Sequence, residues 1–374
     1  MGKHGKGVGT CCMLAVCVIG LPVLASSIDL CTFRSPQTDL TTLFMTFNYS
    51  YVDLPDTPHV DVSSGRVSAS FVHTHDEPDF ALSVSGNAEA SLDHLRFDSV
   101  WGDGSISSRF YVPEAEPAFA FAELTGNYAD AAAQPGMEFR MGAGYGRLTD
   151  VSPLARAVRI ETALLDAFVL TDPLSDEALR AIGTLIAQEA EFSGIGELVS
   201  EIESVIIKES GEVLNTRALL SIAEQIRTEV VSQQCGWITQ FGIGYELVRR
   251  FGGTRMLLLS LSSDMSRPLS LTSQIGVHAD ISSPLMMSTS GAYALTASTA
   301  YSRRLSETTR WVAEYALQRL RQTTGITTTG ETLEIQLLFD LGRVDLTVSG
   351  ALSRGTGSAG WTEQIAASVR VDLL

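Results

Sequence analysis

The densest group of side chains able to do chemistry is the run from His73 to Glu77, which reads His-Thr-His-Asp-Glu. His73 and His75 are two residues apart, so on an extended chain they share a face and could hold one metal ion together with a nearby carboxylate. Two histidines without a distant third ligand are a weak metal signal. We therefore interpret the run as a polar turn, keep His73 and His75 as weak metal candidates only, and expect no metal or cofactor.

A second set of polar side chains is spread over the C-terminal part of the chain. Each falls on the polar phase of a segment whose other phase is apolar, so the set should line one side of a sheet. Its members are Gln240, Glu246, His278, Asp280, Glu314, Glu334, Asp345, Arg370 and Asp372. Paired carboxylates could do acid–base chemistry, but no Ser/His/Asp set accompanies them. We predict that these residues line a lumen, keep it wet and attract cations, and that none is catalytic.

Three glycines, Gly142, Gly144 and Gly146, resemble a dinucleotide-binding fingerprint. The context contradicts that interpretation, because the next helix begins only after Ser152, the strand alternates, and no βαβ unit follows. Inward-facing glycines on a barrel strand explain the same letters, so we expect no nucleotide to bind there.

The elements that must position these residues alternate with a period of two. From Thr362 to Leu373, Ile365, Val369 and Val371 fall on one face of an extended strand, and polar residues fall on the other. Similar segments predict about six strands between residues 40 and 146 and about eight from residue 237 onward. Beyond the amino terminus no apolar run approaches the ~18 residues that a spanning helix needs. The pattern predicts an all-β, up-and-down antiparallel transmembrane barrel of about fourteen strands.

The predicted connections alternate in length. Those near Asp76 and at residues 114–117 are short, whereas those at 56–64, 93–104 and 130–136 are longer. We expect a break at Gly102-Asp-Gly104 and a short turn at Ser266-Arg-Pro268. Transmembrane barrels have tight turns at one end and longer loops at the other, so both ends of the first strand group should lie at the end with tight turns.

Between Asp150 and Gln234 the period changes to 3.6, which predicts four amphipathic helices. Ser152 is a candidate N-cap with Pro153 at the first helical position, and Ser175 begins the second helix. The last apolar stripe extends to Val230. The segment from Asp150 to Cys235 holds fifteen acidic and six basic residues, so it cannot lie in hydrocarbon. Because it follows an even number of strands, it should hang in the periplasm; the alternative is that it folds into the lumen as a plug.

The strands that flank this insert resemble each other. Residues 140–145 read RMGAGY and residues 240–245 read QFGIGY. This likeness predicts that the two strands are neighbours in one sheet, with the helices inserted between them.

The amino terminus has the features of a secretory signal peptide. Basic residues precede an apolar run from Cys11 to Leu24, and Val23 and Ala25 occupy the −3 and −1 positions of a cleavage site. An uncleaved anchor helix is the alternative. Removal of Lys3 and Lys6 would change the formal charge from −17 to −19. This acidity argues against nucleic acid and anionic lipid as partners.

Cleavage after Ala25 would leave two of the five cysteines, Cys31 and Cys235, in an oxidising compartment. Each precedes a predicted strand at the same end of the barrel. A disulfide between them would tie the start of the barrel to the insert, although two strand starts could also lie far apart around the circumference.

The alternation and the export signal together resemble bacterial outer-membrane β-barrel proteins as a class. The segment from Gly142 to Glu161, GAGYGRLTDVSPLARAVRIE, is also similar to a stretch of uncharacterised barrel proteins that carry a helical insert. The resemblance implies residence in the bacterial cell outer membrane, contact with its lipid, and insertion by the barrel assembly machinery. One departure is the end of the chain, Leu373-Leu374, where such barrels commonly have an aromatic residue.

These interpretations divide the chain into four parts: a signal peptide (1–25), the first half of the barrel (26–149), a helical insert (150–235) and the second half of the barrel (236–374). We expect a passive, cation-preferring, porin-like channel that is not an enzyme. The alternative is an anchor whose acidic insert, residues 152–232, docks a periplasmic or envelope protein. A third hypothesis is an outer-membrane hydrolase that depends on His73 or His75.

Overall fold

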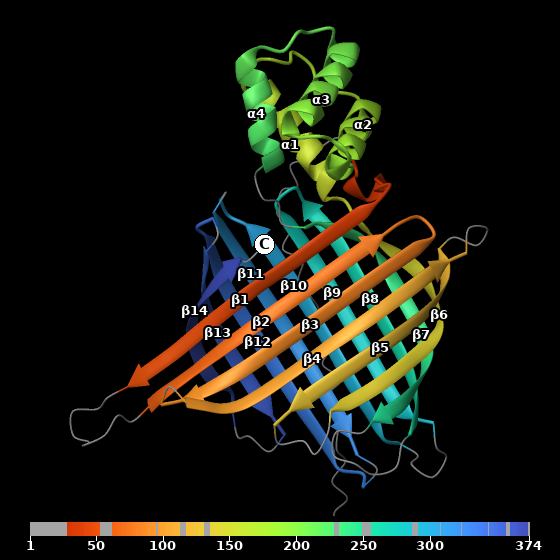
Figure 1. Ribbon diagram of the computed structural model, residues 1–374, viewed down its shortest axis with the longest axis vertical. Coiled ribbons are helices and arrows are strands. Elements are labelled where there is room, and N and C mark those ends of the chain that lie inside the picture. Colours follow the sequence, from red (N-terminus) through yellow and green to blue (C-terminus); the bar gives the residue numbers. More distant parts are fainter. Residues whose placement is uncertain are drawn as a thin grey trace, which may run out of the picture.

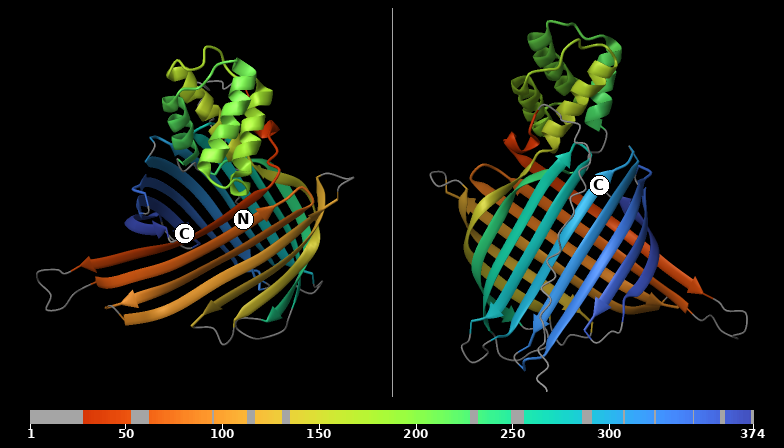
Figure 2. Two further views of the ribbon diagram at one scale, coloured as in Figure 1. Left: turned by 45° about the horizontal axis from the view of Figure 1, so that its top comes forward. Right: turned by 180° about the vertical axis from the view of Figure 1, so that it is seen from behind.

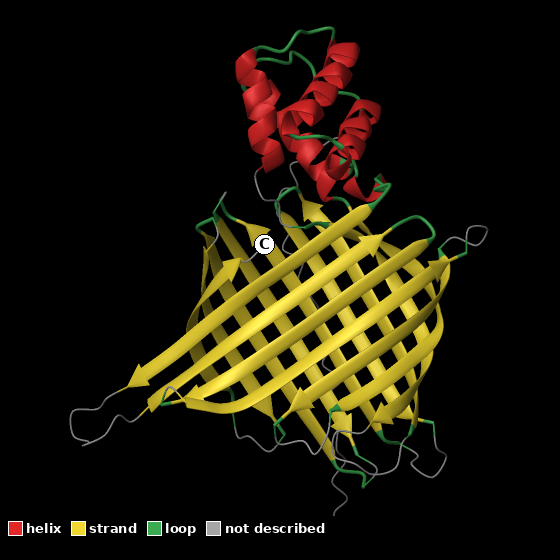
Figure 3. Cartoon of the chain, in the orientation of Figure 1, coloured by secondary structure: helices red, strands yellow, loops and turns green. Residues whose placement is uncertain are grey.

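In a computed structural model the chain forms a closed antiparallel barrel of fourteen strands (Figures 1 and 3). Among the residues that the structure describes, four α-helices lie between the sixth and seventh strands. The structure describes residues 28–52, 62–94, 96–112, 117–130, 135–227, 232–248, 256–285, 291–306, 308–322, 324–342, 344–356 and 360–372. The predicted signal peptide, Val230 and Leu373 lie outside these ranges. The predicted fold class is confirmed.

The strands are long enough to cross a bilayer at a tilt, since about 9–11 residues suffice. The first six are β1 (Thr38–Val52), β2 (Val62–Asp76), β3 (Phe80–Asp93), β4 (Arg96–Tyr111), β5 (Ala118–Ala129) and β6 (Gly136–Asp150). The other eight are β7 (Gln234–Val248), β8 (Leu257–Ser270), β9 (Ser273–Pro284), β10 (Tyr293–Arg304), β11 (Thr309–Arg321), β12 (Thr327–Asp340), β13 (Val344–Gly355) and β14 (Thr362–Asp372).

Each strand pairs with its neighbours in the sequence, and β1 closes the barrel by pairing with β14. The closing register runs from Phe44 opposite Asp372 to Phe47 opposite Val369. As the likeness of their sequences predicted, β6 and β7 are neighbours, and Gly142 stands directly opposite Gly242. Closure satisfies the backbone hydrogen bonds that an open sheet edge would expose to lipid.

The expected break at Gly102-Asp-Gly104 is wrong, because these residues lie within β4. Gly104 pairs with Gly86 of β3, and a Cβ added at Gly102 would lie 3.0 Å from the Asn87 carbonyl oxygen. These glycines therefore permit close approach of two strands. β3 already ends at Asp93 and β4 begins at Arg96, and His94, directly after β3, has a positive φ of 47°.

The expected turn at Ser266-Arg-Pro268 is also wrong. β8 continues to Ser270, and the turn into β9 consists of Leu271 and Thr272. The register of β8 with β9 shifts between Pro268 and Ser270. Pro268 is tolerated at this position because the pairing is irregular at the end of the ladder, where the N–H that proline lacks is not needed.

Four helices form a separate domain at the end of the barrel where β6 ends and β7 begins (Figure 2). They are α1 (Ser152–Asp166), α2 (Asp176–Ala187), α3 (Ile195–Ser210) and α4 (Thr216–Arg227). One apolar core joins them, in which Leu154, Leu179 and Ile202 are fully buried. The domain stands beyond the barrel end and does not fill the lumen. No helix among the described residues is both long and apolar enough to span a bilayer.

Of the two predicted N-terminal features, Ser175 at the second helix is confirmed as an N-cap and Ser152 at the first is not. Ser175 is the N-cap of α2, and its side chain accepts a hydrogen bond from the Ala178 amide at 3.2 Å. Ser152, however, is the first residue of α1, and Val151 precedes it as N-cap. The Asp150 carboxylate accepts the hydrogen bond from the Ser152 amide at 2.9 Å, so it supplies the oxygen that Ser152 was expected to supply.

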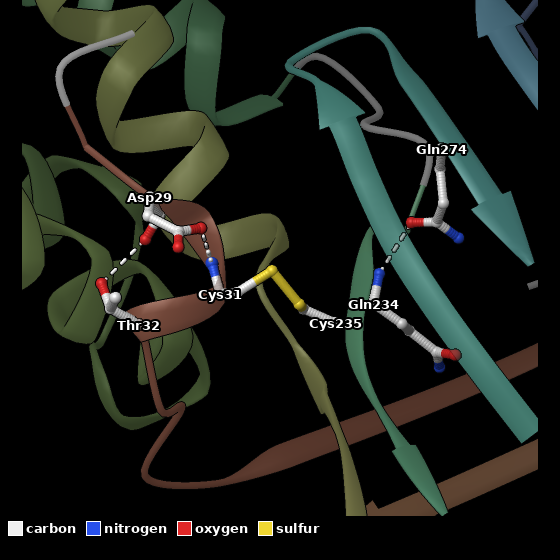
Figure 4. Close-up of a disulfide and its surroundings, with 6 residues drawn as sticks. All are labelled: Asp29, Cys31, Thr32, Gln234, Cys235 and Gln274. Carbon is white, nitrogen blue, oxygen red and sulfur yellow. Dashed lines mark hydrogen bonds between the residues drawn. A yellow bond between two sulfur atoms is a disulfide. The ribbon is translucent and has the colours of Figure 1, made fainter. Parts of the chain in front are cut away.

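The segment before β1 joins the helical domain to the barrel. A single 3₁₀ turn, η1 (Leu30–Thr32), places Ile28, Leu30 and Phe33 in the helical core. Cys31, in the same turn, forms a disulfide with Cys235 at the start of β7 (Figure 4). The helical domain is thus held to the barrel where α1 follows β6 and by this covalent link.

Candidate functional site: the inner wall of the barrel

The two faces of the wall follow from the register. Side chains alternate along a strand, and residues directly opposite each other on paired strands share a face. One face carries contacts between strands that are not neighbours, such as Arg147 of β6 with Asp76 of β2 at 2.7 Å. Such contacts can form only on the concave side, so this face is the lumen.

The opposite face is apolar and exposed in the isolated chain. Exposed apolar side chains on this face are expected of a surface that contacts hydrocarbon. They include Met45, Phe47, Met141, Phe241, Ile243, Leu257, Leu261, Ile335, Leu337, Val348, Leu352, Ile365 and Val369.

On the inner face, two aromatic rings lie over a row of glycines. Phe119 and Phe121 of β5 are 2% and 5% exposed and stand opposite Gly144 and Gly142. A Cβ at Gly144 would lie 2.1 Å from the Phe119 ring, and one at Gly142 would lie 2.8 Å from the Phe121 ring. The glycines therefore provide the space in which the rings are buried.

The same glycine row makes room for a charged cluster beside the rings. The Arg140 guanidinium contacts Glu138 at 2.5 Å and Glu123 at 3.8 Å. Glu138 Oε1 lies 2.8 Å from the point where a Cβ of Gly244 would be, so a larger residue on β7 would displace it. Asp280 of β9 interacts electrostatically with Arg140, although β7 and β8 lie between their strands.

Further charges continue the inner face on both sides of this cluster. His278 Nδ1 lies 2.6 Å from Asp264 Oδ1. Arg370 of β14 donates a hydrogen bond to the Asp345 carboxylate of β13. Glu314 and Glu334 stand directly opposite each other on β11 and β12. Like charges in that relation repel, so this pair opposes sheet stability.

At the end near the helices, the lumen is bordered by Arg147. Its guanidinium contacts Asp76 at 2.7 Å, donates to the Pro78 carbonyl at 2.8 Å, and lies 4.4 Å from the centre of the Tyr111 ring. Gly146, directly before it, has a φ of +100°, which L side chains rarely adopt. The glycine redirects the chain so that Arg147 reaches the mouth of the barrel.

In the strand register, the nine residues predicted to line a lumen fall on the phase of the inner face. They are Gln240, Glu246, His278, Asp280, Glu314, Glu334, Asp345, Arg370 and Asp372. The structure brings only some of them into contact with each other, as with Arg370 and Asp345.

Sequence reasoning missed four charged residues of the inner face, which are Glu123, Glu138, Arg140 and Asp264. Glu138 and Arg140 alternate with apolar neighbours in the same way as the residues that were identified. The same polar-phase rule, applied to the first strand group, would have found both. Their approach to Asp280 could not be read from spacing, because it depends on which strands are neighbours around the barrel.

The weak metal candidates lie elsewhere. His73 and His75 are on the outer phase of β2, where His73 Nδ1 contacts Thr41 Oγ1 at 2.8 Å and His75 Nδ1 contacts Asp39 Oδ2 at 3.3 Å. His75 Nε2 lies 3.2 Å from Glu77 Oε1. Among the residues that the structure describes, no group of three or more His, Cys, Asp or Glu is arranged to hold a metal ion.

Comparison with known proteins adds the following. No family model matches the chain, and no curated protein matches it. Among solved structures, the chain is similar to the CymD monoaromatic hydrocarbon channel (11% identity, TM-score 0.33, covering 91% of this chain and 90% of that one). It is similar to a BenF-like porin from Pseudomonas fluorescens Pf-5 (9%, 0.36, 91% and 99%) and to Omp33 of Acinetobacter baumannii (6%, 0.33, 91% and 100%).

The chain's own geometry defines its class. A closed antiparallel barrel with an apolar outer face and a polar inner face has the architecture of bacterial outer-membrane β-barrel proteins. The fold is porin-like.

Proposed function

We propose that this chain is a passive, cation-preferring pore of the bacterial outer membrane. The observation that carries the proposal is the excess of carboxylates on the inner face of β5 to β9. That face holds Glu123, Glu138, Glu246, Asp264 and Asp280, with Arg140 and His278 among them. Fixed negative charge along the wall of a water-filled lumen raises the local concentration of cations and repels anions.

We infer the orientation from the lengths of the connections, to which the short interval between β3 and β4 is an exception. The turns at residues 77–79 and 271–272 lie at the end that carries the helical domain (Figure 1). The intervals between β7 and β8 and between β9 and β10, whose flanking strand ends lie at the other end, are longer. Tight turns face the periplasm in such barrels, which supports a periplasmic helical domain. Export by residues 1–25 is part of the same proposal.

Single-channel recording in planar bilayers tests the proposal. With a KCl gradient across the bilayer, the reversal potential should have the sign that shows K⁺ passing more readily than Cl⁻. Replacing Glu123 and Asp280 by Gln and Asn should move that potential toward zero, while Asp172→Asn in the helical domain should leave it unchanged. A barrel without conductance, or one that prefers Cl⁻, would refute the function.

A second candidate is an envelope anchor whose helical domain docks a protein. The position of the domain favours it, because helices beyond the barrel end leave their surface free for a partner. Deletion of residues 152–232 separates the two functions: a pore should still conduct, whereas an anchor should lose its partner. The deletion would also uncover Ile28, Leu30 and Phe33, so point variants on the domain surface give a cleaner test.

A further inference from the structure

The end of the helical domain farthest from the barrel is formed by two loops, residues 167–175 after α1 and residues 211–215 before α4, which we call the tip. A hydrogen bond of 2.5 Å from Thr171 Oγ1 to Glu212 Oε1 joins the two loops. The first loop is anchored inward by Leu170 and Leu174, and the second by Leu214, all at most 6% exposed. These three leucines therefore hold both loops against the apolar core of the helical domain.

Phe168 is the exceptional residue of the tip. Its side chain is 94% exposed, and its φ is +55°. The Phe168 amide donates to the Leu165 carbonyl and the Val169 amide donates to the Leu164 carbonyl, both at 2.9 Å. This is the Schellman ending of a helix, in which the residue with positive φ is usually glycine.

The end of α3 in the same tip provides an internal comparison. There the left-handed residue is Gly211, with a φ of +73°. At the equivalent place after α1 the chain carries a phenylalanine, which strains the backbone and exposes a large apolar ring to water. Neither feature helps the domain to fold. A strained, exposed residue on a rigid support indicates a role in contacts with another molecule.

Phe168 is one of three large apolar side chains at this end. Val213 in the second loop is 81% exposed, and Leu220 in the second turn of α4 is 66% exposed. The charges around them are mainly negative. Asp166, Asp172, Asp176, Glu177, Glu209 and Glu212 belong to the tip and the adjoining helix ends, against Lys208 and Arg217.

We propose that the tip is a docking surface for a protein that presents an apolar pocket with a basic rim, and that Phe168 is the anchor that enters the pocket. An exposed aromatic anchor surrounded by charge is a common form of binding hot spot. The excess of carboxylates selects a basic partner by electrostatic complementarity. It also disfavours a second copy of this chain, whose tip carries the same charge, and a membrane with anionic headgroups. This proposal rests on the docking function proposed for the helical domain and does not depend on conduction by the barrel.

Site-specific photo-cross-linking of the full chain in its native cells tests the proposal. We expect p-benzoylphenylalanine at position 168 to give one discrete adduct, and the same reagent at the exposed position 200 of α3 to give none. Mass spectrometry should locate the cross-link in a different protein, within a segment of net positive charge. An adduct to a second copy, an adduct to lipid, or the absence of any adduct at position 168 would overturn the proposal.

Variants separate docking from folding. With the cross-linker at position 213, Phe168→Gly should reduce the adduct at least tenfold, whereas Phe168→Tyr, which keeps the ring, should retain it. Asp166→Lys with Asp172→Lys should also reduce it at least tenfold. Helical content and heat-modifiable migration of each variant should match the parent chain. Undiminished cross-linking in Phe168→Gly would refute the role of Phe168 as the anchor. Channel conductance of the same variants is measured separately, and if it is unchanged, the pore proposal stands even where the docking proposal fails.

Discussion

Cys31 and Cys235, which are 204 residues apart in the sequence, are joined by a disulfide with their Cα atoms 5.4 Å apart. The bond links the segment before the first strand to the first residues of the seventh (Figure 4). Hydrogen bonds hold both sides: Asp29 Oδ1 accepts from the Cys31 amide at 3.0 Å, and Gln274 Oε1 accepts from the Gln234 amide at 2.8 Å. The barrel end and the helical domain therefore share one covalently closed junction.

Replacing both cysteines by serine should destabilise this junction. Without the bond, the segment that supplies Ile28, Leu30 and Phe33 to the helical core is held only by packing. We expect the free energy of unfolding of the helical domain to fall by about 2–5 kcal/mol, the usual effect of losing a native disulfide. Circular dichroism at 222 nm during thermal unfolding measures it, with heat-modifiable migration as the control for the barrel. An unchanged helical transition would show that packing alone suffices.

Gly146 should not tolerate a side chain. Its φ is +100°, and a Cβ there would lie 2.2 Å from the Trp237 carbonyl oxygen of β7. Gly146→Ala should destabilise the barrel by at least about 2 kcal/mol through backbone strain and overpacking. Urea unfolding from micelles, followed by tryptophan fluorescence, measures the loss. Gly350→Ala is the matched control, since no atom lies within 4 Å of its added Cβ.

Phe168→Gly should have the opposite effect on stability. Glycine accepts the left-handed conformation without the Cβ clash that costs an L residue about 1–2 kcal/mol. Glycine also makes the unfolded chain more flexible, which reduces the net gain to about 0.5–1 kcal/mol. The helical transition should therefore move to higher temperature. A clear destabilisation would mean that the exposed ring makes contacts within the domain, against the role proposed for the tip.

The barrel could be predicted from the sequence because alternation is a local property. Leu43, Met45 and Phe47 mark the outer face of β1 whatever its partners are. Glycines were misread for a physical reason: Gly102 and Gly104 break an isolated strand, but in a barrel they let β3 approach closely. The contact of Arg140 with Glu123, and its approach to Asp280, depend on the order of strands around the circumference, which no single strand encodes.

Phe168 illustrates a different limit. Its spacing from Leu154, Val158 and Leu165 predicts a place on the apolar stripe of the first helix, which is wrong, because α1 ends at Asp166 and the Phe168 side chain is exposed. Only the backbone conformation reveals the strain. Likewise, the oxygen that accepts a hydrogen bond at the start of α1 comes from Asp150 and not from Ser152. Asp150 is the last residue of β6, and its carboxylate lies beside the first turn of α1.

Glu161 should make the stability of the helical domain depend on pH. The carboxyl is 7% exposed, and burial raises its pKa above the ordinary value, with Asp176 adding to the rise and the hydrogen bond from the Leu174 amide at 2.7 Å opposing it. Between the ordinary value, about 4.3, and the raised one, the folded domain binds more protons than the unfolded chain. Stability from this group is therefore fully present below that window and falls as pH rises through it.

Two substitutions isolate the effect of Glu161. Glu161→Gln keeps an oxygen for the Leu174 amide but has no charge to desolvate, so its stability relative to the parent should increase as pH rises through the window. Glu161→Ala leaves the Leu174 amide without its partner and should cost about 1–3 kcal/mol. Denaturant unfolding of both variants at several pH values provides the measurement. A parallel pH dependence of Glu161→Gln and the parent would contradict the assignment to this carboxyl.

Arg140 should limit the cation preference of the proposed pore. Its guanidinium neutralises part of the charge of Glu123 and Glu138, so Arg140→Gln should increase the ratio of K⁺ to Cl⁻ permeability, whereas Asp280→Asn should decrease it. A unit charge about 4 Å from a hydrated ion is worth about 1 kcal/mol in water, which corresponds to a change of up to about fivefold. Reversal potentials at low and high salt measure both effects, and screening should reduce them at high salt. If both variants changed the ratio in the same direction, or neither changed it, ions would not pass beside this cluster.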